Sequence, residues 1–400
     1  MEGREEIYQI GLSRTPGIGL AHAKKLIKRF GSASEVFRAT KDELLSAGLR
    51  EEPAQAILEF CGHAAVEAEV RVLASKKIRP LFFTDPDYPR RLLSIPEAPP
   101  ILFYRGKADL NTKKILAVVG TRAADDYGKQ MTANLIRQLA QPIRQLAEPI
   151  GQLADPGLLV VSGLAFGIDA AAHSAAMVNR LPTVAVLGHG LGTIYPTEHR
   201  AMADAMVEEG GLLTALDYHV RAERFHFPDR NRWVAGMCDA LLVVETGKEG
   251  GSMLTVNCAV KYGKKIFAVP GRATDHRSAG CNSLIRQGTA QMVSSGQELT
   301  AAMGWEWPAG GAGTQAKLEF GRPGGGAQTM MESGSSADGS LSAEDRLLGL
   351  LRKKESSAID ELIACSHLDA SAVALSLLNL ELRGSVRGLP GKRYMLAGGG

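Results

Sequence analysis

The sequence predicts an α/β protein built on an extended Rossmann-like, doubly wound and mainly parallel sheet, with a further domain before it and another after it along the chain. Between about residue 115 and residue 299, strand-like runs alternate with segments of helical periodicity. The runs are continuously apolar and rich in β-branched residues, as expected of parallel strands that helices cover on both faces. The predicted strands are Ile115–Val119, Leu158–Val161, Thr183–Leu187, Ala240–Val244 and Lys265–Val269.

Residues 1–78 are expected to form a helical domain of the helix-hairpin-helix or SAM-like type. Apolar residues recur at helical spacing over Leu20–Phe30, Lys41–Ala47 and Pro53–Val72. The turn at residues 15–19, Thr-Pro-Gly-Ile-Gly, has lysines shortly after it and would let backbone amides approach a phosphate; residues 47–57 are a candidate second copy. An ordinary corner between two helices, with glycine in the turn, fits the same residues. Both interpretations stay open.

Residues 79–300 are assigned to the core, which contains an unusual repeat. Three copies of one seven-residue unit occupy residues 136–156 and end in Pro142, Pro149 and Pro156. Pro142 and Pro149 are expected to break the α-helix that the apolar spacing otherwise predicts. We interpret the extra copies as a tandem expansion that lengthens a surface connection between a helix and a strand, because insertions at the surface cost little stability.

Two further regions follow the core. Residues 301–341 are predicted to be a flexible linker, because most of this tract is rich in Gly, Ser and Pro. Residues 342–397 return to helical periodicity and predict a winged-helix-like domain, with apolar faces at Leu347–Leu351, Ala358–Ile363 and Val373–Leu380 and a candidate hairpin at Ser385–Met395. The candidate recognition helix carries Asn379, Glu381 and Arg383 but is poor in Lys and Arg, which favours docking to a protein over reading of duplex DNA.

The composition narrows the class of protein. The net charge of +3 requires any nucleic-acid surface to be a local patch. The five cysteines form no Cys-x-x-Cys pair, which argues against a structural zinc site and against a disulfide framework. The N-terminus has no secretory h-region, and no apolar run is long enough to cross a bilayer. We therefore expect a cytoplasmic protein with no membrane partner and no metal site.

Two predicted strands end in residues that suit a phosphate. The strand at 158–161 runs into Ser162-Gly163-Leu-Ala-Phe166-Gly167-Ile-Asp169 and then into an Ala-rich helix, a layout that points backbone N–H groups and a helix N-terminus at an anion. Gly120-Thr121-Arg122 follows another strand. Its glycine permits a sharp bend, its threonine hydroxyl can donate, and an arginine guanidinium fits phosphate oxygens. The sequence therefore predicts a phosphate-holding site at these strand ends.

A cluster of arginines and aromatic residues occurs further along. Phe227 begins the run Phe-Pro-Asp-Arg230-Asn231-Arg232, and the same neighbourhood contains Arg221, Arg224, Phe225, His226 and Trp233. Arginine mixed with aromatic residues suits single-stranded nucleic acid, because the charge binds the backbone and the rings stack on bases. The rival interpretation is a buried ion-pair cluster that Asp229 and Glu223 would neutralise.

Catalytic interpretations of these motifs are weaker. Gly188-His-Gly190-Leu-Gly192 lacks the third glycine of a dinucleotide fingerprint, and Tyr195-Pro196 interrupts the position where the helix should begin. Ser162 lacks the spacing of a nucleophile elbow. Asp169 and His173 lie one helical turn apart, but residues of these types at a helix N-terminus more often cap or pack than perform chemistry. We expect no catalytic residues and no cofactor.

Taken together, these motifs resemble the DNA-processing protein A (DprA/Smf) family. The resemblance covers most of residues 80–295. It is carried by the motifs around Gly120-Thr-Arg122, Ser162 to Asp169, Phe227 to Arg232, Gly251-Ser252-Met-Leu-Thr255 and Gly280-Cys-Asn282. The chain departs from the pattern at Thr214-Ala-Leu-Asp217, where many relatives have Ser-Glu, and at the repeat of residues 136–156.

The resemblance implies a non-enzymatic mediator of DNA recombination. Such a protein binds single-stranded DNA in its Rossmann-like core, forms a homodimer through that core and displaces or accommodates single-strand-binding protein. It protects incoming single strands and loads the RecA recombinase during natural transformation. By resemblance, Arg122, Arg230 and Arg232 would hold phosphates, Phe166 or Phe227 would stack on a base, and Ser162, Gly163, Gly251, Ser252 and Asn282 would line the pocket. Gly120, Thr121, Gly167, Asp169 and Asn231 complete the expected DNA-binding set.

The alternative is a nucleotide-binding enzyme of the phosphoribohydrolase type on a related Rossmann scaffold. Those enzymes carry a Pro-Gly-Gly-x-Gly-Thr loop followed by a glutamate. In this chain the loop at residues 249–255 is followed by Val256-Asn257, with no catalytic carboxylate in place. Release of free base from a nucleoside monophosphate would favour the alternative.

Overall fold

The computed structural model describes residues 2–147, 157–305, 343–352, 356–366, 368, 373, 376–377, 380, 386–389 and 393–396. The chain divides into two compact units, residues 1–314 and 315–400. Among the described helices, none has both the length and the apolar content to cross a membrane.

A large mixed sheet forms the centre of the first unit. In the described part of the chain, its strands lie in the order β1-β2-β6-β5-β4-β3-β7-β8-β9. The strands from β6 to β9 in this order pair in parallel, whereas β1 and β2 extend the sheet in antiparallel pairing. The strands are β1 (Arg79–Phe82), β2 (Ile101–Gly106), β3 (Lys114–Gly120), β4 (Leu158–Ser162), β5 (Thr183–Val186), β6 (Gly211–Thr214), β7 (Ala240–Val244), β8 (Lys265–Ala268) and β9 (Gln291–Met292). The predicted doubly wound, mainly parallel sheet is confirmed.

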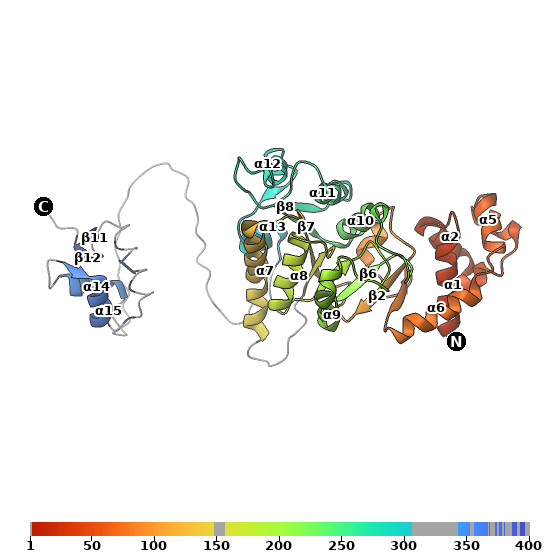
Figure 1. Ribbon diagram of the computed structural model, residues 1–400, viewed down its shortest axis with the longest axis horizontal. Coiled ribbons are helices and arrows are strands. Elements are labelled where there is room, and N and C mark those ends of the chain that lie inside the picture. Colours follow the sequence, from red (N-terminus) through yellow and green to blue (C-terminus); the bar gives the residue numbers. More distant parts are fainter. Residues whose placement is uncertain are drawn as a thin grey trace, which may run out of the picture. The chain divides into compact units, whose positions relative to one another are not determined.

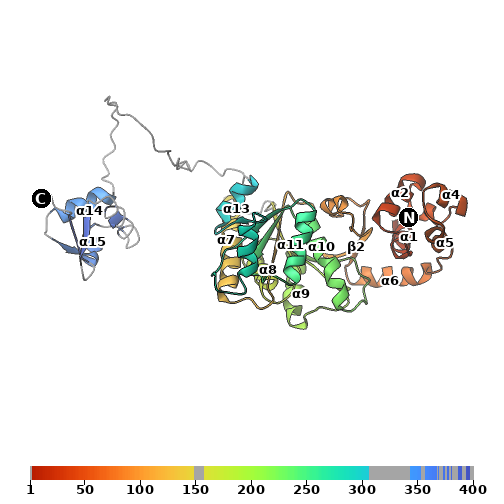
Figure 2. The ribbon, with the colours of Figure 1, turned by 90° about the horizontal axis from the view of Figure 1, so that it is seen from above.

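Helices cover both faces of this sheet (Figure 1, Figure 2). Along β3, Ala117 and Val119 belong to the apolar core beneath α10 (Phe227–Met237), α11 (Gly251–Lys261) and α12 (Ala279–Arg286). Leu116 and Val118 belong to the core on the other face, beneath α7 (Asp126–Ala147), α8 (Ile168–Val178) and α13 (Gly296–Met303). α9 (Arg200–Glu209) packs on β2, β5 and β6. This burial on both faces is the physical reason that the central strands are continuously apolar. Short 3₁₀ turns lie at η1 (Arg90–Ser94), η2 (Thr197–His199) and η3 (Arg224–His226).

The N-terminal region is helical, as predicted. It contains α1 (Glu2–Arg14), α2 (Leu20–Phe30), α3 (Ala33–Val36), α4 (Lys41–Ser46), α5 (Glu51–Leu58) and α6 (His63–Ser75). The single helix predicted over Pro53–Val72 is wrong, because α5 ends at Leu58 and α6 begins at His63. Phe60 lies in the break and its ring contacts those of Phe37 and His63. The half-buried Phe60 ring packs here within a cluster of aromatic side chains.

Arg14, the last residue of α1, connects the helical region with the core. Its guanidinium lies 2.6 Å from a carboxylate oxygen of Glu69 on α6 and 2.7 Å from one of Asp217, which follows β6. Asp217 belongs to the segment where the sequence departs from the family pattern. Its carboxylate therefore has a structural partner in this chain.

The predicted break of a helix at Pro142 is wrong. α7 continues through Pro142 to Ala147, and Leu135, Ile136 and Leu139 on it are buried against the sheet. A proline inside a helix removes one backbone hydrogen bond and bends the helix, but it does not always end it. Pro149 and Pro156 lie outside the described residues.

The second unit has its own small core. α14 (Ala343–Leu351) and α15 (Ile359–Ser366) correspond to two of the predicted helices. β11 (Val386–Leu389) and β12 (Arg393–Leu396) correspond to the predicted hairpin, and β10 (Ser357–Ala358) pairs with β12. The buried side chains include Leu347, Leu351, Leu362, Val373 and Leu377. Asn379, Glu381 and Arg383 lie outside the described residues. In the range assigned to the linker, α13 extends to Met303, and residues 306–341 lie outside the described residues.

Candidate nucleic-acid interface

An open cleft of about 620 Å³ lies where β3, β4 and β7 end at the carboxyl edge of the sheet. β3 has β4 on one side and β7 on the other, so the strand order reverses there. Such a switch point is the usual ligand site of an open α/β sheet. The residues that line the cleft are Val119, Gly120, Thr121, Arg122, Ala165, Asp169, Tyr195, Arg224, Phe227, Pro228, Arg230, Asn231, Thr246, Gly247, Glu249, Gly250, Gly251, Ser252, Leu254 and Thr255.

Two exposed arginines line this cleft without a carboxylate partner. Arg122 follows β3, and its guanidinium carbon lies 5.6 Å from the centre of the Phe227 ring. Arg224 begins η3 and is also exposed. Neither side chain forms an ion pair with a described carboxylate. Both charges are therefore available to an anion in solution.

Arg230 has a different environment, because its side chain is only 5% exposed. Its Nη1 donates to the carbonyl oxygens of Gly163 and Val186, the latter at 3.3 Å. Asp169 accepts the amides of Gly163 and Ala165 at 3.2 and 3.3 Å. Burial lowers the pKa of Arg230 and raises that of Asp169, and the opposite charge of each partner counteracts this effect. Arg230 and Asp169 therefore hold the loop after β4 in place.

Gly163 is required by this arrangement. A Cβ atom at position 163 would lie 1.5 Å from Nη1 of Arg230. The absence of a side chain lets the guanidinium approach the backbone of the loop closely. The role of Gly163 is thus to admit Arg230, although it also lines a smaller hollow beside the cleft.

Arg232 does not line the cleft, so the expectation that three arginines gather there is wrong. Its guanidinium forms an ion pair with Asp229. Residues two apart on a helix do not share a face, and Arg230 and Arg232 on α10 therefore point in different directions. The pairing of Arg232 with Asp229 agrees with one part of the rival interpretation, but this ion pair is partly exposed and is not a buried cluster.

Aromatic side chains surround the mouth of the cleft. Phe227, the first residue of α10, contacts the guanidinium groups of both Arg122 and Arg230. Tyr195 and Phe166 are 50% and 44% exposed, and both line the smaller hollow that also includes Phe227. The Phe166 ring packs against His199. Three accessible rings beside a guanidinium are suited to stacking on bases.

The N-terminus of α11 opens into the same cleft. Gly250 precedes the helix with a φ of +133°, and no atom lies within 4 Å of the position that a Cβ of Gly251 would occupy. Asn231 donates its Nδ2 to the Gly251 carbonyl at 3.2 Å, and the Ser252 hydroxyl lies 2.6 Å from that of Thr246. Unpaired N–H groups at a helix N-terminus favour an anion.

Several predicted residues have structural roles. Thr121 donates its amide to the Glu245 carbonyl and lines the cleft, whereas Gly167 packs on the carbonyl of Thr121. Ser162 is fully buried and donates its hydroxyl to the Val118 carbonyl at 2.6 Å. Asn282 bonds both the amide and the carbonyl of Gly271. Neither Ser162 nor Asn282 lines the cleft, so their predicted contact with a ligand is not supported.

Sequence reasoning missed part of the lining. The sequence indicates Tyr195 only as an interruption of a helix, and Arg224 only as a neighbour of the arginine cluster. Thr246, Gly247 and Gly250 were not predicted at all. A signal for these residues existed, since they follow the predicted strand Ala240–Val244 at the same sheet edge. Glu249 also lines the cleft and adds an exposed carboxylate to its rim.

His173 and the glycine-rich loop at residues 188–192 serve packing within the core. His173 is buried, with its Nδ1 2.7 Å from the Thr183 hydroxyl, and desolvation lowers its pKa to about 3. The burial of His173 and its contact with Thr183 support packing as the role of this residue. Gly190 donates its amide to the Val220 carbonyl, and a Cβ at position 190 would lie 2.0 Å from the Asp217 carbonyl oxygen. Protein backbone therefore occupies the space beside this glycine.

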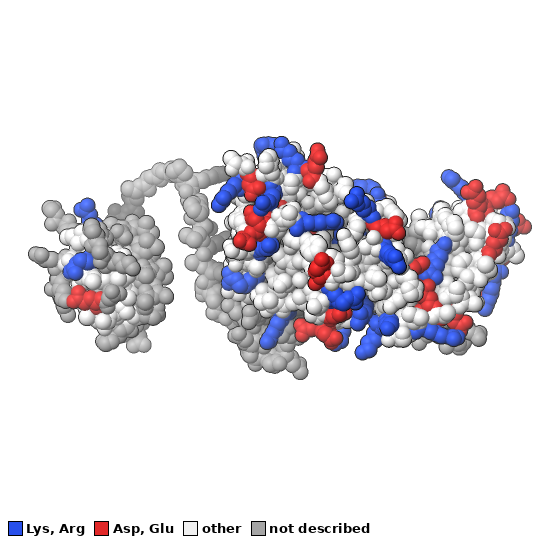
Figure 3. Space-filling model, in the orientation of Figure 1, with Lys and Arg blue, Asp and Glu red and all other residues white. Residues whose placement is uncertain are grey.

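Charge on the surface agrees with the near-neutral balance of the chain. On the face that Figure 3 shows, Lys and Arg side chains lie among Asp and Glu side chains over the described part of the core. Any positive charge that attracts a ligand must therefore come from a few neighbouring side chains, and Arg122 and Arg224 in the cleft are such a pair.

Family models and individual relatives of this chain point to the same family. A family model described as DNA recombination-mediator protein A matches residues 79–304, and one described as the DprA winged helix domain matches residues 332–392. Protein Smf of Synechocystis sp. is 30% identical over 98% of this chain and 99% of its own length. DNA processing protein DprA of Streptococcus pneumoniae is 37% identical over 54% of this chain and 71% of its own.

A solved structure extends the similarity to the fold. The X-ray structure of DprA from Streptococcus pneumoniae matches with a TM-score of 0.61 and 31% identity, over 74% of this chain and 97% of that one. The core match exceeds half of the chain, and the Smf match spans nearly all of it. The chain therefore belongs to the DNA recombination-mediator protein A (DprA/Smf) family.

Proposed function

We propose that the chain binds single-stranded DNA along the cleft at the carboxyl edge of the sheet and acts there as a recombination mediator. The observation that carries the proposal is the combination of two exposed guanidinium groups, which have no ion-pair partner among the described residues, with accessible aromatic rings. Arg122 and Arg224 would bind phosphates, and Phe227, Tyr195 and Phe166 would stack on bases. A duplex keeps its bases stacked on each other, so the rings favour a single strand.

The N-terminus of α11 supports the same assignment. Its first turn carries the partial positive charge of the helix, and Gly251 presents backbone without a side chain. A phosphate placed there would lie in the same cleft as Arg122. Glu249 on the rim would repel the backbone of the DNA and help to restrict its path.

In the cell we propose the role that membership of the family suggests. The chain would protect incoming single strands in the cytoplasm, accommodate or displace single-strand-binding protein, and load the RecA recombinase during natural transformation. We further propose that it does so as a homodimer. No catalytic step is assigned to the cleft, so incubation with nucleoside monophosphates should release no free base.

Binding to oligonucleotides of equal length tests the proposal. In a gel shift at moderate salt, the full chain should retain the single strand and bind the duplex more weakly. Arg122→Ala and Arg224→Ala should each weaken single-strand binding roughly tenfold, since each removes one charge-assisted contact to a phosphate.

A matched control separates this effect from a general loss of positive charge. Arg180 is exposed and lies shortly before β5, at the opposite edge of the sheet. Arg180→Ala should leave the affinity unchanged. Equal affinities for all three variants, or equal retention of duplex and single strand, would contradict the proposal.

A further inference from the structure

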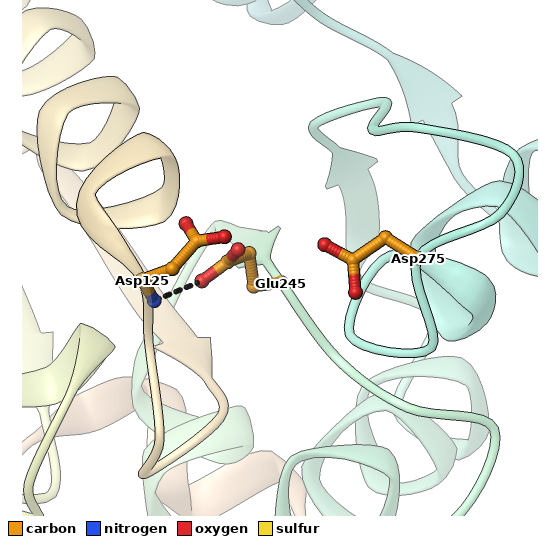
Figure 4. Close-up of side chains that lie close together, drawn as sticks. All are labelled: Asp125, Glu245 and Asp275. Carbon is orange, nitrogen blue, oxygen red and sulfur yellow. Dashed lines mark hydrogen bonds between the residues drawn. The ribbon is translucent and has the colours of Figure 1, made fainter.

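A cluster of three carboxylates lies beside the cleft and has no part in the proposed binding of DNA. Asp125 lies directly before α7, Glu245 directly after β7, and Asp275 in the segment between β8 and α12 (Figure 4). One carboxylate oxygen from each residue lies within 4.8 Å of those from the other two. Three separate segments of the core therefore bring acidic groups to one point.

Glu245 is the buried member, with 2% of its surface exposed. Its Oε2 accepts the amide of Asp125 at 3.1 Å, whereas its Oε1 is buried and has no hydrogen-bond partner among the described residues. Figure 4 shows this second oxygen facing the carboxylate of Asp125. Two acceptors that face each other inside a protein are costly unless a positive species lies between them.

The charges nearby leave an excess of negative charge. Arg277 lies 3.2 Å from an oxygen of Asp125, and its backbone amide donates to Asp275. With all groups ionised, three carboxylates and one guanidinium sum to two negative charges.

We propose that Asp125, Glu245 and Asp275 together bind one hard divalent cation. Carboxylate oxygens suit Ca²⁺, Mg²⁺ or Mn²⁺ better than softer metals. Ligands at Ca²⁺ distances can lie up to about 5 Å apart, and at Mg²⁺ distances up to about 4 Å. The upper limit of 4.8 Å therefore fits Ca²⁺ as the side chains lie, and Mg²⁺ after a small closure. A proton shared between two carboxylates is the other way to compensate such a cluster, but it would join only two of the three groups, whereas one cation can bind all three.

The cation would connect segments that form the rim of the cleft. Asp125 lies three residues after Arg122, and Glu245 directly precedes Thr246. A bound ion would fix these two loops to each other and to the segment that carries Asp275. The site itself does not depend on DNA, so it can be tested with the metal alone.

Isothermal titration calorimetry of the full chain with CaCl2, and separately with MgCl2, at constant ionic strength and neutral pH provides the test. We expect one ion per chain, and a higher melting temperature with the ion than with the same ionic strength of NaCl. Glu245→Gln and Asp275→Asn should each weaken binding at least about tenfold. Glu208→Gln, which alters an exposed carboxylate paired with Lys107, is the matched control and should bind normally.

Two results would overturn the proposal. One is the absence of stoichiometric binding by the wild-type chain at millimolar Ca²⁺ and Mg²⁺; if Glu245→Gln then melts at a higher temperature, a shared proton accounts for the cluster instead. The other is unchanged cation binding by Glu245→Gln or Asp275→Asn when that variant is folded. Circular dichroism identifies which of the two variants fold. Asp275→Asn provides this test even if Glu245→Gln does not fold.

Discussion

Arg122 and Arg230 both contact the ring of Phe227, but only Arg122 is exposed to water. This difference separates a residue that can bind a ligand from one that holds the protein together. Arg230 donates to two carbonyls and faces Asp169, which in turn holds the amides of the loop after β4. The sequence could place both arginines near one sheet edge, but it could not show that one of them is buried.

Replacement of Arg230 should therefore affect stability first. Arg230→Ala would leave Asp169 buried without its cation, and we expect the free energy of unfolding to fall by about 3 kcal/mol. Arg230→Lys should recover only part of this, because Lys restores the positive charge but does not place a donor at the position where Nη1 of Arg230 reaches both carbonyls. Urea unfolding of each variant, followed by circular dichroism, measures the change.

Arg232→Ala is the comparison for this measurement. Its ion pair with Asp229 is partly exposed, so the change should cost less than about 1 kcal/mol. A variant Arg230→Ala as stable as Arg232→Ala would show that Arg230 has no structural role.

At the scale of elements, buried parallel strands were the easiest to predict. The predicted β7 has the observed bounds, and β3, β4, β5 and β8 differ by one residue at an end or at both ends, because a run covered on both faces must be apolar throughout. β1, β2, β6 and β9 were not predicted. β1 contains Pro80, β6 begins at Gly211 and β9 has only two residues, and each of these features weakens the apolar pattern on which such predictions depend.

His173 connects α8 with β5 and should make this contact sensitive to pH. The Thr183 hydroxyl donates to the Val160 carbonyl, so His173 donates from Nδ1 and its buried Nε2 carries no proton. The unfolded chain binds a proton below about pH 6.5, whereas the folded chain does not until about pH 3. The contribution of His173 to stability is therefore complete above pH 6.5 and falls by about 1.4 kcal/mol for each pH unit below it.

Melting temperatures between neutral pH and pH 5 test this contribution. His173→Asn keeps a donor near Thr183 but cannot titrate in this range, so its melting temperature should fall less steeply than that of the wild type as the pH is lowered. Parallel curves for the two proteins would mean that His173 does not contribute to the loss of stability in acid.

At the scale of the whole molecule, the location of the cleft was predictable, whereas the residues that line it were only partly so. Parallel strands end at one edge of a sheet, so Gly120 to Arg122 and the loop after Ser162 had to lie close together. The direction of a side chain on a helix depends on packing that a sequence does not show, and this is why the prediction for Arg232 was wrong. Arg224 and Tyr195 lie on irregular segments, whose course no periodicity predicts.

The cleft also limits how strongly salt can affect binding. Each phosphate that the protein neutralises contributes about 0.7 to the slope of log affinity against log salt for a single strand. The two free arginines of the cleft should therefore account for a slope of about 1.4. Stacking of bases on Phe227 and Tyr195 would add affinity that salt does not remove.

The most direct test is the salt dependence of single-strand binding, measured by fluorescence anisotropy for the wild type and for the double variant Arg122→Ala with Arg224→Ala. We predict that the magnitude of the slope falls by about 1.4 in the double variant and stays unchanged in Arg180→Ala. A double variant with the wild-type slope would contradict the claim that these two guanidinium groups bind the phosphates of DNA.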